Sequence, residues 1–128
     1  MNTGSFSRVD RIFRFPREEK LKGRDEIRKL FNARKCVSCP GVKLFTLRNG
    51  LQYNRIAFTF SRKFGNAVKR NRSRRLGREA YRLLRDGLVQ GNDMAMLLFP
   101  ERDPAKDTLL IRMNQFRELF SRAGLIKS

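Results

Sequence analysis

The stretch from residue 62 to residue 85 restricts what this chain can fold into more than any other feature. It holds ten Lys or Arg residues and a single acid, Glu79, so its net charge is +9, half of the +18 carried by the 128-residue chain. Leucine and alanine recur within it at helical spacing, which predicts a helix from about Ala67, with Asn66 as N-cap and Gly87 as terminator. Such a helix must bury one side and keep its charged side in water.

Placement of residues around this helix, at about 100° per residue, predicts two faces. One arc gathers the apolar side chains Leu76, Ala80, Leu83 and Leu84. A second arc, roughly opposite, gathers Arg70, Arg74, Arg78, Arg82 and Arg85. A solvated charged face is the alternative interpretation, but such faces usually mix signs, and this stretch does not. We therefore predict a stripe of guanidinium groups that binds nucleic acid, because phosphates relieve the repulsion between the arginines and accept bidentate hydrogen bonds.

The rest of the chain indicates one α+β domain, residues 23–128, preceded by a basic arm with interleaved aromatic residues, residues 1–22. The predicted order is helix–strands–helix–strand–helix, with helices at 24–34, from about 67 and from 109, and strands at 42–47, 55–60 and 94–99. Asn49-Gly50 predicts a hairpin between the first two strands. Thr108 is the expected N-cap of the last helix, and Gly124 lies just past its end. We expect a sheet of about four strands packed by three helices.

Residue types that are missing or scattered exclude several kinds of catalytic site. The chain has no histidine, which excludes Ser-His and Cys-His nucleophile pairs. The closest acids, Asp103 and Asp107, fall in a predicted loop, so a nuclease that works without a partner is disfavoured. No apolar run approaches the roughly 20 residues that cross a membrane, and no signal peptide is visible, so we expect a cytoplasmic protein.

The only cysteines, Cys36 and Cys39, form a C-x-x-C pair. Structural zinc usually takes four ligands, and because the chain has no other Cys and no His, a zinc site would have to be shared between chains. A redox pair of the thioredoxin type should open a helix, whereas this pair follows a helical pattern. Reduced thiols without a special role are the simpler interpretation.

Residues 64–82 resemble the signature of the bacterial ribonuclease P protein subunit. FGNAVKRNRSRRL at residues 64–76, continued by REAYR at residues 78–82, is similar to the family pattern K-x-G-x-A-V-x-R-N-R-x-K/R-R-x-x-R. The resemblance covers about residues 20–123 and implies a subunit of an endoribonuclease whose RNA subunit removes the 5′ leader of precursor tRNA by Mg²⁺-dependent hydrolysis. The implied partners are ribonuclease P RNA and precursor tRNA, with no membrane and no obligatory protein partner. Mg²⁺ is then held mainly by the RNA, and the protein alone binds no cofactor.

The resemblance implies two sets of site residues. The surface that binds the catalytic RNA comprises Arg62, Lys63, Asn66, Lys69, Arg70, Asn71, Arg72, Arg74, Arg75, Arg78 and Arg82. The cleft for the leader, between the first helix and the sheet, comprises Arg24, Ile27, Phe31 and Phe45. Aromatic faces stack on unpaired bases while nearby cations follow the phosphates. Simple core packing is the alternative for Phe31 and Phe45, and Ile27 stands where the family often has an aromatic residue.

Two further expectations concern the topology of the fold and the alternative functions of the chain. The family fold implies a left-handed crossover from strand 55–60 through the basic helix to strand 94–99, although general rules favour the right-handed form. A ribosomal or other structural RNA-binding protein of the same fold type is the alternative function, and the motif from Asn66 to Arg75 favours ribonuclease P. A DNA-binding regulator is disfavoured because no helix-turn-helix pair precedes the basic helix.

Overall fold

The computed structural model describes residues 17–100 and 107–127 of the chain. Its elements are the helices α2 (Arg24–Ala33), α3 (Ala67–Leu84) and α4 (Leu109–Arg122) and the strands β1 (Cys36–Cys39), β2 (Val42–Arg48), β3 (Arg55–Phe60) and β4 (Asn92–Leu98). Short 3₁₀ turns occupy Arg17–Glu19 and Arg85–Gly87. The predicted α+β class, with three helices and four strands, is confirmed. Residues 1–16 of the predicted arm, and Asp103, lie outside the described residues.

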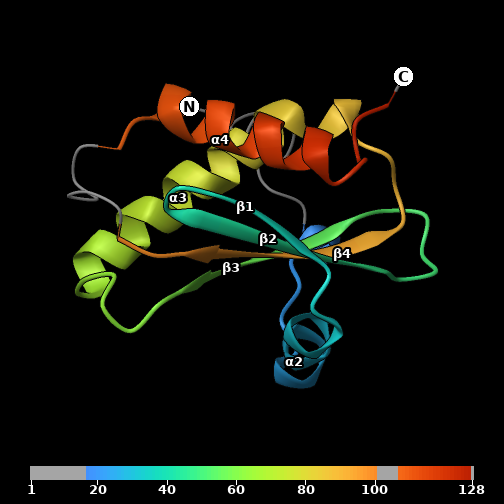
Figure 1. The fold of residues 1–128 in the computed structure, drawn as a ribbon, viewed down its shortest axis with the longest axis horizontal. Coiled ribbons are helices and arrows are strands. Elements are labelled where there is room, and N and C mark those ends of the chain that lie inside the picture. The colour runs from blue at the N-terminus through green and yellow to red at the C-terminus, as the bar shows by residue number, and fades with distance from the viewer. Residues whose placement is uncertain (1–16, 101–106, 128) are drawn as a thin grey trace, which may run out of the picture.

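The four strands form one mixed sheet in the order β1-β2-β4-β3. β2 runs antiparallel to both β1 and β4, whereas β3 and β4 are parallel. Helices α3 and α4 cover one face of this sheet, and α2 lies against the other face (Figure 1). The sheet therefore has two differently covered faces, and only α2 belongs to the second one.

The predicted hairpin at Asn49-Gly50 is wrong. β4 lies between β2 and β3, so the two strands that this turn was expected to join are not neighbours. The connecting residues 49–54 are enough to pass the end of β4, and Asn49 donates its backbone N–H to Gly91 O at 3.0 Å. The true hairpin joins β1 to β2 through Pro40 and Gly41, where Gly41 has a φ of 86°. A positive φ at a tight turn is the conformation that glycine adopts without strain.

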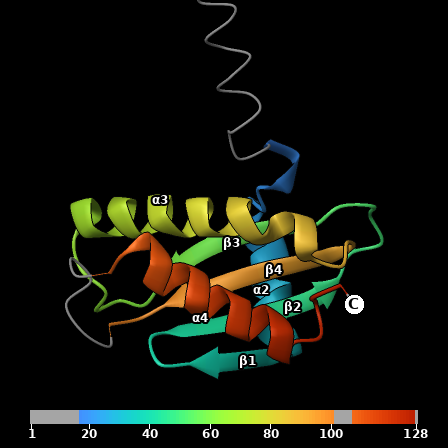
Figure 2. The same cartoon turned by 90° about the horizontal axis from the view of Figure 1, so that it is seen from above.

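The connection from β3 through α3 to β4 is left-handed, as the family resemblance implied. In Figure 2, α3 lies on the viewer's side of the sheet, both strands run to the left, and β4 lies below β3. A right-handed crossover would place β4 on the other side of β3. This arrangement puts α3 over the β3 edge of the sheet.

A larger core fills the space between the sheet and the helices α3 and α4, and it includes Tyr81, Phe116 and Phe120. The buried residues of α3 are Ser73, Gly77, Ala80 and Tyr81. Gly77 packs so close to β3 that a Cβ there would lie 2.8 Å from the ring of Phe58. The prediction that Leu83 faces the core is wrong, because Leu83 is 46% exposed. The line of closest approach runs through the small residue Gly77, and the arginine stripe consequently flanks the buried face instead of opposing it.

Helix termini follow the local sequence. The Asn66 side chain accepts a hydrogen bond from Lys69 N at 3.0 Å, and Thr108 Oγ1 accepts one from Ile111 N at 3.2 Å. Both predicted N-caps are confirmed. α3 itself ends at Leu84, and the 3₁₀ turn that follows ends at Gly87.

Candidate nucleic-acid interface

The exposed part of the interface is a group of cations at the start of α3. Arg62, Lys63, Lys69 and Arg75 are exposed, and with the described residues their side chains form no hydrogen bond or ion pair. The helix N-terminus beside them adds partial positive charge. The first half of α3 therefore presents positive charge that the described part of the chain does not neutralise.

Asn71, Arg74, Arg75 and Arg78 line a shallow depression of about 290 Å³ on α3. Arg74 donates to Asn71 Oδ1 at 2.8 Å, and its guanidinium lies 5.2 Å from the centroid of the Phe60 ring. Burial lowers the pKa of Arg78, and the neighbouring charge of Arg74 lowers it further. Two guanidinium groups that repel each other around a hollow form a site that a bound phosphate would stabilise.

The end of α3 and the 3₁₀ turn that follows it differ, because their arginines have acidic partners. Arg82 forms an ion pair with Glu79, and the hydrogen bond from Arg82 lowers the pKa of Glu79. Arg85 forms an ion pair with Glu19, which also accepts a hydrogen bond from the Tyr81 hydroxyl at 2.9 Å. Burial and the charge of Glu19 raise the pKa of Tyr81. Arg82, one of the predicted RNA-binding residues, is thus already paired.

Two other predicted residues, Arg70 and Arg72, donate to backbone oxygens. Arg70 Nη2 donates to the carbonyls of Ser61 and Arg62, each at 3.3 Å. Arg72 Nη2 donates to Asp107 O at 2.7 Å. The structure brings both residues into the basic surface, but it directs these N–H groups inward.

A groove of about 180 Å³ continues from the depression toward the β3 edge. Its lining residues are Lys20, Leu21, Lys22, Ile27, Ile56, Ala57, Phe58, Thr59, Arg74 and Arg78. Arg74 and Arg78 line both hollows. Because Leu21 N donates to Ile56 O at 2.9 Å, the segment before α2 extends along part of the β3 edge. The groove therefore joins α2, β3 and α3 and has cations on both sides.

The sheet face under α2 is built from three rows of side chains that the strand register places side by side. In the middle row, Phe45, Ala95 and Ala57 pack beneath α2 in a second, smaller core. Lys43, Leu97 and Thr59 form the next row on the same face, and all three are at least partly exposed. This second row forms a floor beside α2 that none of the described helices covers.

The four predicted cleft residues occupy different parts of this region. Ile27 lines the groove. Phe31 and Phe45 meet edge to face at 4.8 Å between ring centroids, pack against the smaller core and remain partly exposed. Arg24 is exposed at the first position of α2. Core packing therefore explains why part of each ring is buried, and contact of the rings with RNA stays a prediction.

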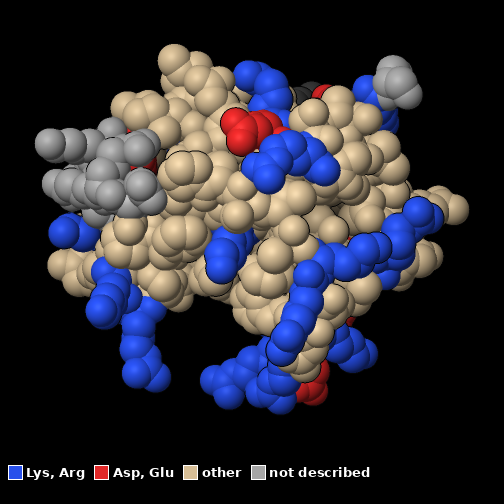
Figure 3. Space-filling model, in the orientation of Figure 1, with Lys and Arg blue, Asp and Glu red and all other residues tan. Residues whose placement is uncertain are grey.

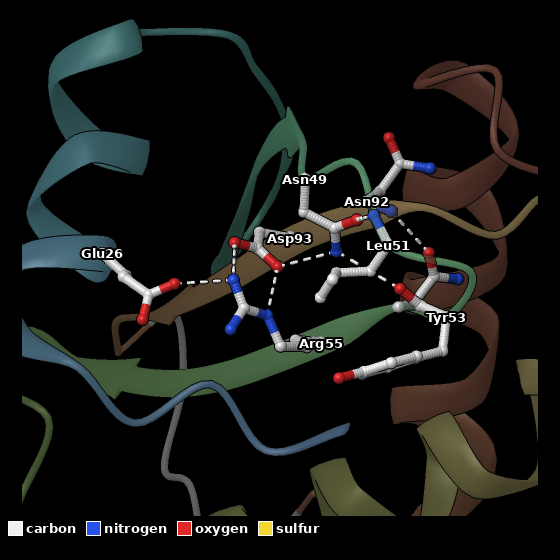
Figure 4. A network of polar contacts seen from close by, with 8 residues as sticks. Glu26, Asn49, Leu51, Tyr53, Arg55, Asn92 and Asp93 are labelled. Atoms are coloured by element: carbon white, nitrogen blue, oxygen red, sulfur yellow. Dashed lines mark hydrogen bonds and ion pairs between the residues drawn. The ribbon is translucent and has the colours of Figure 1, made fainter. Parts of the chain in front are cut away.

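A polar network, which the sequence did not reveal, fixes α2 against the third row, which consists of Leu47, Asp93 and Arg55. Arg55 Nη2 donates to Glu26 of α2 at 2.6 Å, while Arg55 Nε and Nη2 donate to the two carboxylate oxygens of Asp93 at 2.8 and 2.7 Å. Asn49 Nδ2 adds a hydrogen bond to Asp93 Oδ1 at 2.9 Å, and Figure 4 shows these side chains converging. The hydrogen bond with Asp93 raises the pKa of Arg55. The network could have been predicted from the strand register that places Arg55 of β3 opposite Asp93 of β4. The wrongly predicted hairpin between β2 and β3 hid this register.

Positive charge is unevenly distributed over the side of the molecule that carries β1 and α4 (Figure 2 and Figure 3). In Figure 3, the basic side chains gather along the lower edge, around α2 and the adjoining end of the molecule, whereas the surface over α4 carries few charges. No described helix is long and apolar enough to cross a membrane. The cytoplasmic location stays a prediction.

The cysteine pair lies on β1, with Cys36 exposed and Cys39 partly buried. Burial raises the pKa of the Cys39 thiol. Side chains alternate along a strand, so residues three apart point to opposite faces of the sheet. Cys36 and Cys39 therefore cannot ligate the same metal ion while β1 keeps this conformation.

A family model described as Ribonuclease P matches residues 15–124. The chain belongs to this family. The ribonuclease P protein component of Natranaerobius thermophilus is 39% identical over 77 residues, which cover 60% of this chain and 67% of that protein. The ribonuclease P protein component of Dictyoglomus turgidum is 28% identical over 116 residues, covering 91% of this chain and 98% of that protein. The ribonuclease P protein of Thermotoga maritima has the same fold, with a TM-score of 0.73 and 23% identity over 81% of this chain and 96% of that one.

Family membership decides between the two RNA-binding hypotheses in favour of ribonuclease P. The chain is a subunit of an endoribonuclease of tRNA processing, and the family implies partnership with ribonuclease P RNA. The ribonuclease P protein of Staphylococcus aureus also shares the fold, with a TM-score of 0.72, 22% identity, and coverage of 85% of this chain and 98% of that one.

Proposed function

We propose that this chain binds ribonuclease P RNA through the first half of α3 and holds the 5′ leader of precursor tRNA in the adjoining groove. One observation carries the proposal: Arg74 and Arg78, which form no ion pair with an acid among the described residues, line both the α3 depression and the groove, so the two hollows share these cations. A folded RNA that docks on α3 and a single strand that enters the groove would share these two residues.

The groove and the neighbouring sheet face have the chemistry of a single-strand site. Thr59 and Leu97 supply a partly exposed floor, the rings of Phe31 and Phe45 lie beside it, and Lys22 and Arg78 line the groove. Bases stack on aromatic and apolar surfaces without demanding a sequence, while cations follow the phosphates. Leaders of many sequences would therefore be accepted, as a general tRNA-processing enzyme requires.

We assign Mg²⁺ and the hydrolytic step to the RNA partner. Among the described residues, no three Asp, Glu, Cys or His side chains lie close enough to hold a metal ion together. Mg²⁺ prefers hard oxygen ligands, which RNA phosphates supply. When bound there, Mg²⁺ would activate water and stabilise the leaving oxygen. The contribution of this chain would be to bind and orient the leader.

The test is reconstitution with the cognate catalytic RNA. At low Mg²⁺ the holoenzyme should remove the leader more efficiently than the RNA alone, and the protein alone should cleave nothing. A protein that leaves the reaction of the RNA unchanged at every Mg²⁺ concentration would contradict the proposal.

The leader site has its own test. The holoenzyme should bind precursor tRNA more tightly than mature tRNA, and Lys22→Glu should reduce this preference about tenfold at low salt, because it reverses a charge in the groove. Arg117→Glu, on exposed α4, makes the same charge change away from the groove and should leave the preference intact. Equal effects of both variants would show that only net charge matters.

A further inference from the structure

We infer that Arg70 and Arg72 are positioning residues that hold two chain segments against α3, and that the phosphate contacts of this surface belong to the cations around them. The inference rests on the proposed function, because it divides the basic surface into groups with two different tasks. The two arginines stand on either side of Asn71, which is exposed. Both are partly buried, whereas Lys69 and Arg75 are exposed, and both donate hydrogen bonds to backbone carbonyls.

Arg70 fixes the turn that leads from β3 into α3. Its Nη2 donates to two successive carbonyls, those of Ser61 and Arg62, and its guanidinium lies 6.0 Å from the centroid of the Phe60 ring. Its Nε is buried. The same turn contains the hydrogen bond from Phe64 N to Ser61 O at 3.1 Å. Arg62 and Lys63 project into solvent from this turn, so Arg70 determines where their positive charges lie.

Arg72 fixes the chain that leads into α4. Its acceptor, the backbone oxygen of Asp107, belongs to a residue that is only 5% exposed. The carboxylate of Asp107 pairs in turn with Arg112 of α4, whose Nη2 donates to it at 2.8 Å. Arg112 is 3% exposed. Arg72 therefore joins α3 to a buried ion pair immediately before the Thr108 N-cap.

The chemistry of these contacts requires arginine. A guanidinium offers five donors in a rigid plane, so it can donate inward and still stack on a ring, whereas the ammonium of lysine is a compact charge on a flexible stem. Arg75 is the matched comparison on the same helix. It is exposed, and it forms no hydrogen bond or ion pair with the described residues. A phosphate contact at position 75 needs a cation, which lysine also supplies.

Chemical modification of the wild-type protein tests the inference without any substitution. With an arginine-specific dicarbonyl reagent and mass spectrometry of the peptides, Arg75 should react several-fold faster than Arg70 and Arg72 in the free protein. Ribonuclease P RNA should then protect Arg75. Arg70 or Arg72 reacting as fast as Arg75, and becoming protected by the RNA, would overturn the inference. Failure of the RNA to protect Arg75 would contradict the proposed function instead, and the rates in the free protein would still decide the inference.

Charge-conserving substitutions provide a second test in the reconstituted holoenzyme. Arg70→Lys and Arg72→Lys should each weaken RNA binding about tenfold, because lysine keeps the charge but loses the inward hydrogen bonds. Arg75→Lys should stay within about twofold of wild type. Amide hydrogen exchange of the free Arg70→Lys variant should be faster at Phe64 than in Arg75→Lys. RNA affinity of Arg70→Lys and Arg72→Lys equal to wild type, with unchanged exchange, would assign both residues to phosphate contacts.

Discussion

The two halves of the basic stretch, Ala67–Arg78 and Glu79–Arg85, both carry arginines, but they differ in how those arginines are paired. Up to Arg78 the helix contains cations and no acid, and Lys69 and Arg75 are exposed without a partner among the described residues. Beyond it, Arg82 pairs with Glu79, and Arg85 pairs with Glu19. Counting arginines along the stripe treats both halves alike. Only the positions of the acids, one of which comes from a distant segment, separate the half that we propose binds RNA from the half whose arginines form ion pairs within the protein.

The largest expected effect concerns the first half. Replacing Lys69 and Arg75 together with alanine should lower the slope of log K for ribonuclease P RNA binding against log salt by about 1.5 units, at roughly 0.7–0.9 per lost phosphate contact. Arg117→Ala with Lys127→Ala removes the same charge from α4 and the C-terminal segment, and should leave the slope unchanged. Titration of labelled RNA at several salt concentrations measures both. If the two pairs lower the slope equally, the placement of charge on α3 is irrelevant.

A medium effect concerns the second half. Glu19→Gln removes the charge that pairs with Arg85 and weakens the acceptor for the Tyr81 hydroxyl, so the free energy of unfolding should fall by about 2 kcal/mol. The salt slope of RNA binding should not change. Glu18→Gln, at the exposed neighbouring position, is the control and should be neutral in urea unfolding. A Glu19→Gln protein that is fully stable but binds RNA with an altered slope would reverse the assignment of this half.

The smallest expected effect on stability comes from the ion pair between Arg82 and Glu79. Glu79 is 43% exposed, so Glu79→Gln should cost at most about 0.5 kcal/mol of stability. Because the hydrogen bond from Arg82 lowers the pKa of Glu79 below its ordinary value of 4.5, this contribution is present above that pH. It is lost as the pH falls through the folded-state value.

Urea unfolding measured from about pH 6 down to about pH 3 should show the stabilities of the wild type and Glu79→Gln converging in acid. In Glu79→Gln, Arg82 loses its Glu79 partner and can contact a phosphate, so the salt slope of RNA binding should increase by less than about one unit. A constant stability difference at every pH, or a decreased slope, would show that the ion pair does not neutralise Arg82.

Local features of the fold could be predicted because their causes are local. Asn66 and Thr108 cap their helices through hydrogen bonds to residues three positions ahead, and such contacts depend only on nearby sequence. The family motif likewise lies within one segment. The inward face of α3 was predicted only in part, since helical spacing alone cannot show that Gly77 lets the helix approach Phe58 and leaves Leu83 exposed.

The candidate site was predictable as a set of residue types but not as a set of contacts. Sequence reasoning placed Arg70 and Arg82 together with Arg75 on one surface. The structure separates them, because Arg70 donates to the carbonyls of Ser61 and Arg62, and Arg82 pairs with Glu79. The groove residues Lys22 and Thr59 gave no signal, since an exposed lysine and a strand threonine are common. They become candidate leader-binding residues only because the structure places them with Arg78 in one groove.

An arginine-rich helix with an apolar side and a motif typical of ribonuclease P proteins could be recognised from the amino-acid sequence alone. The tertiary structure decided the strand order, which inserts β4 between β2 and β3 and brings Arg55 beside Asp93. It also decided which arginines keep their charge unpaired. The physical reason is range: capping and helical spacing act over a few residues, whereas strand pairing and ion pairing join residues that are distant in the chain.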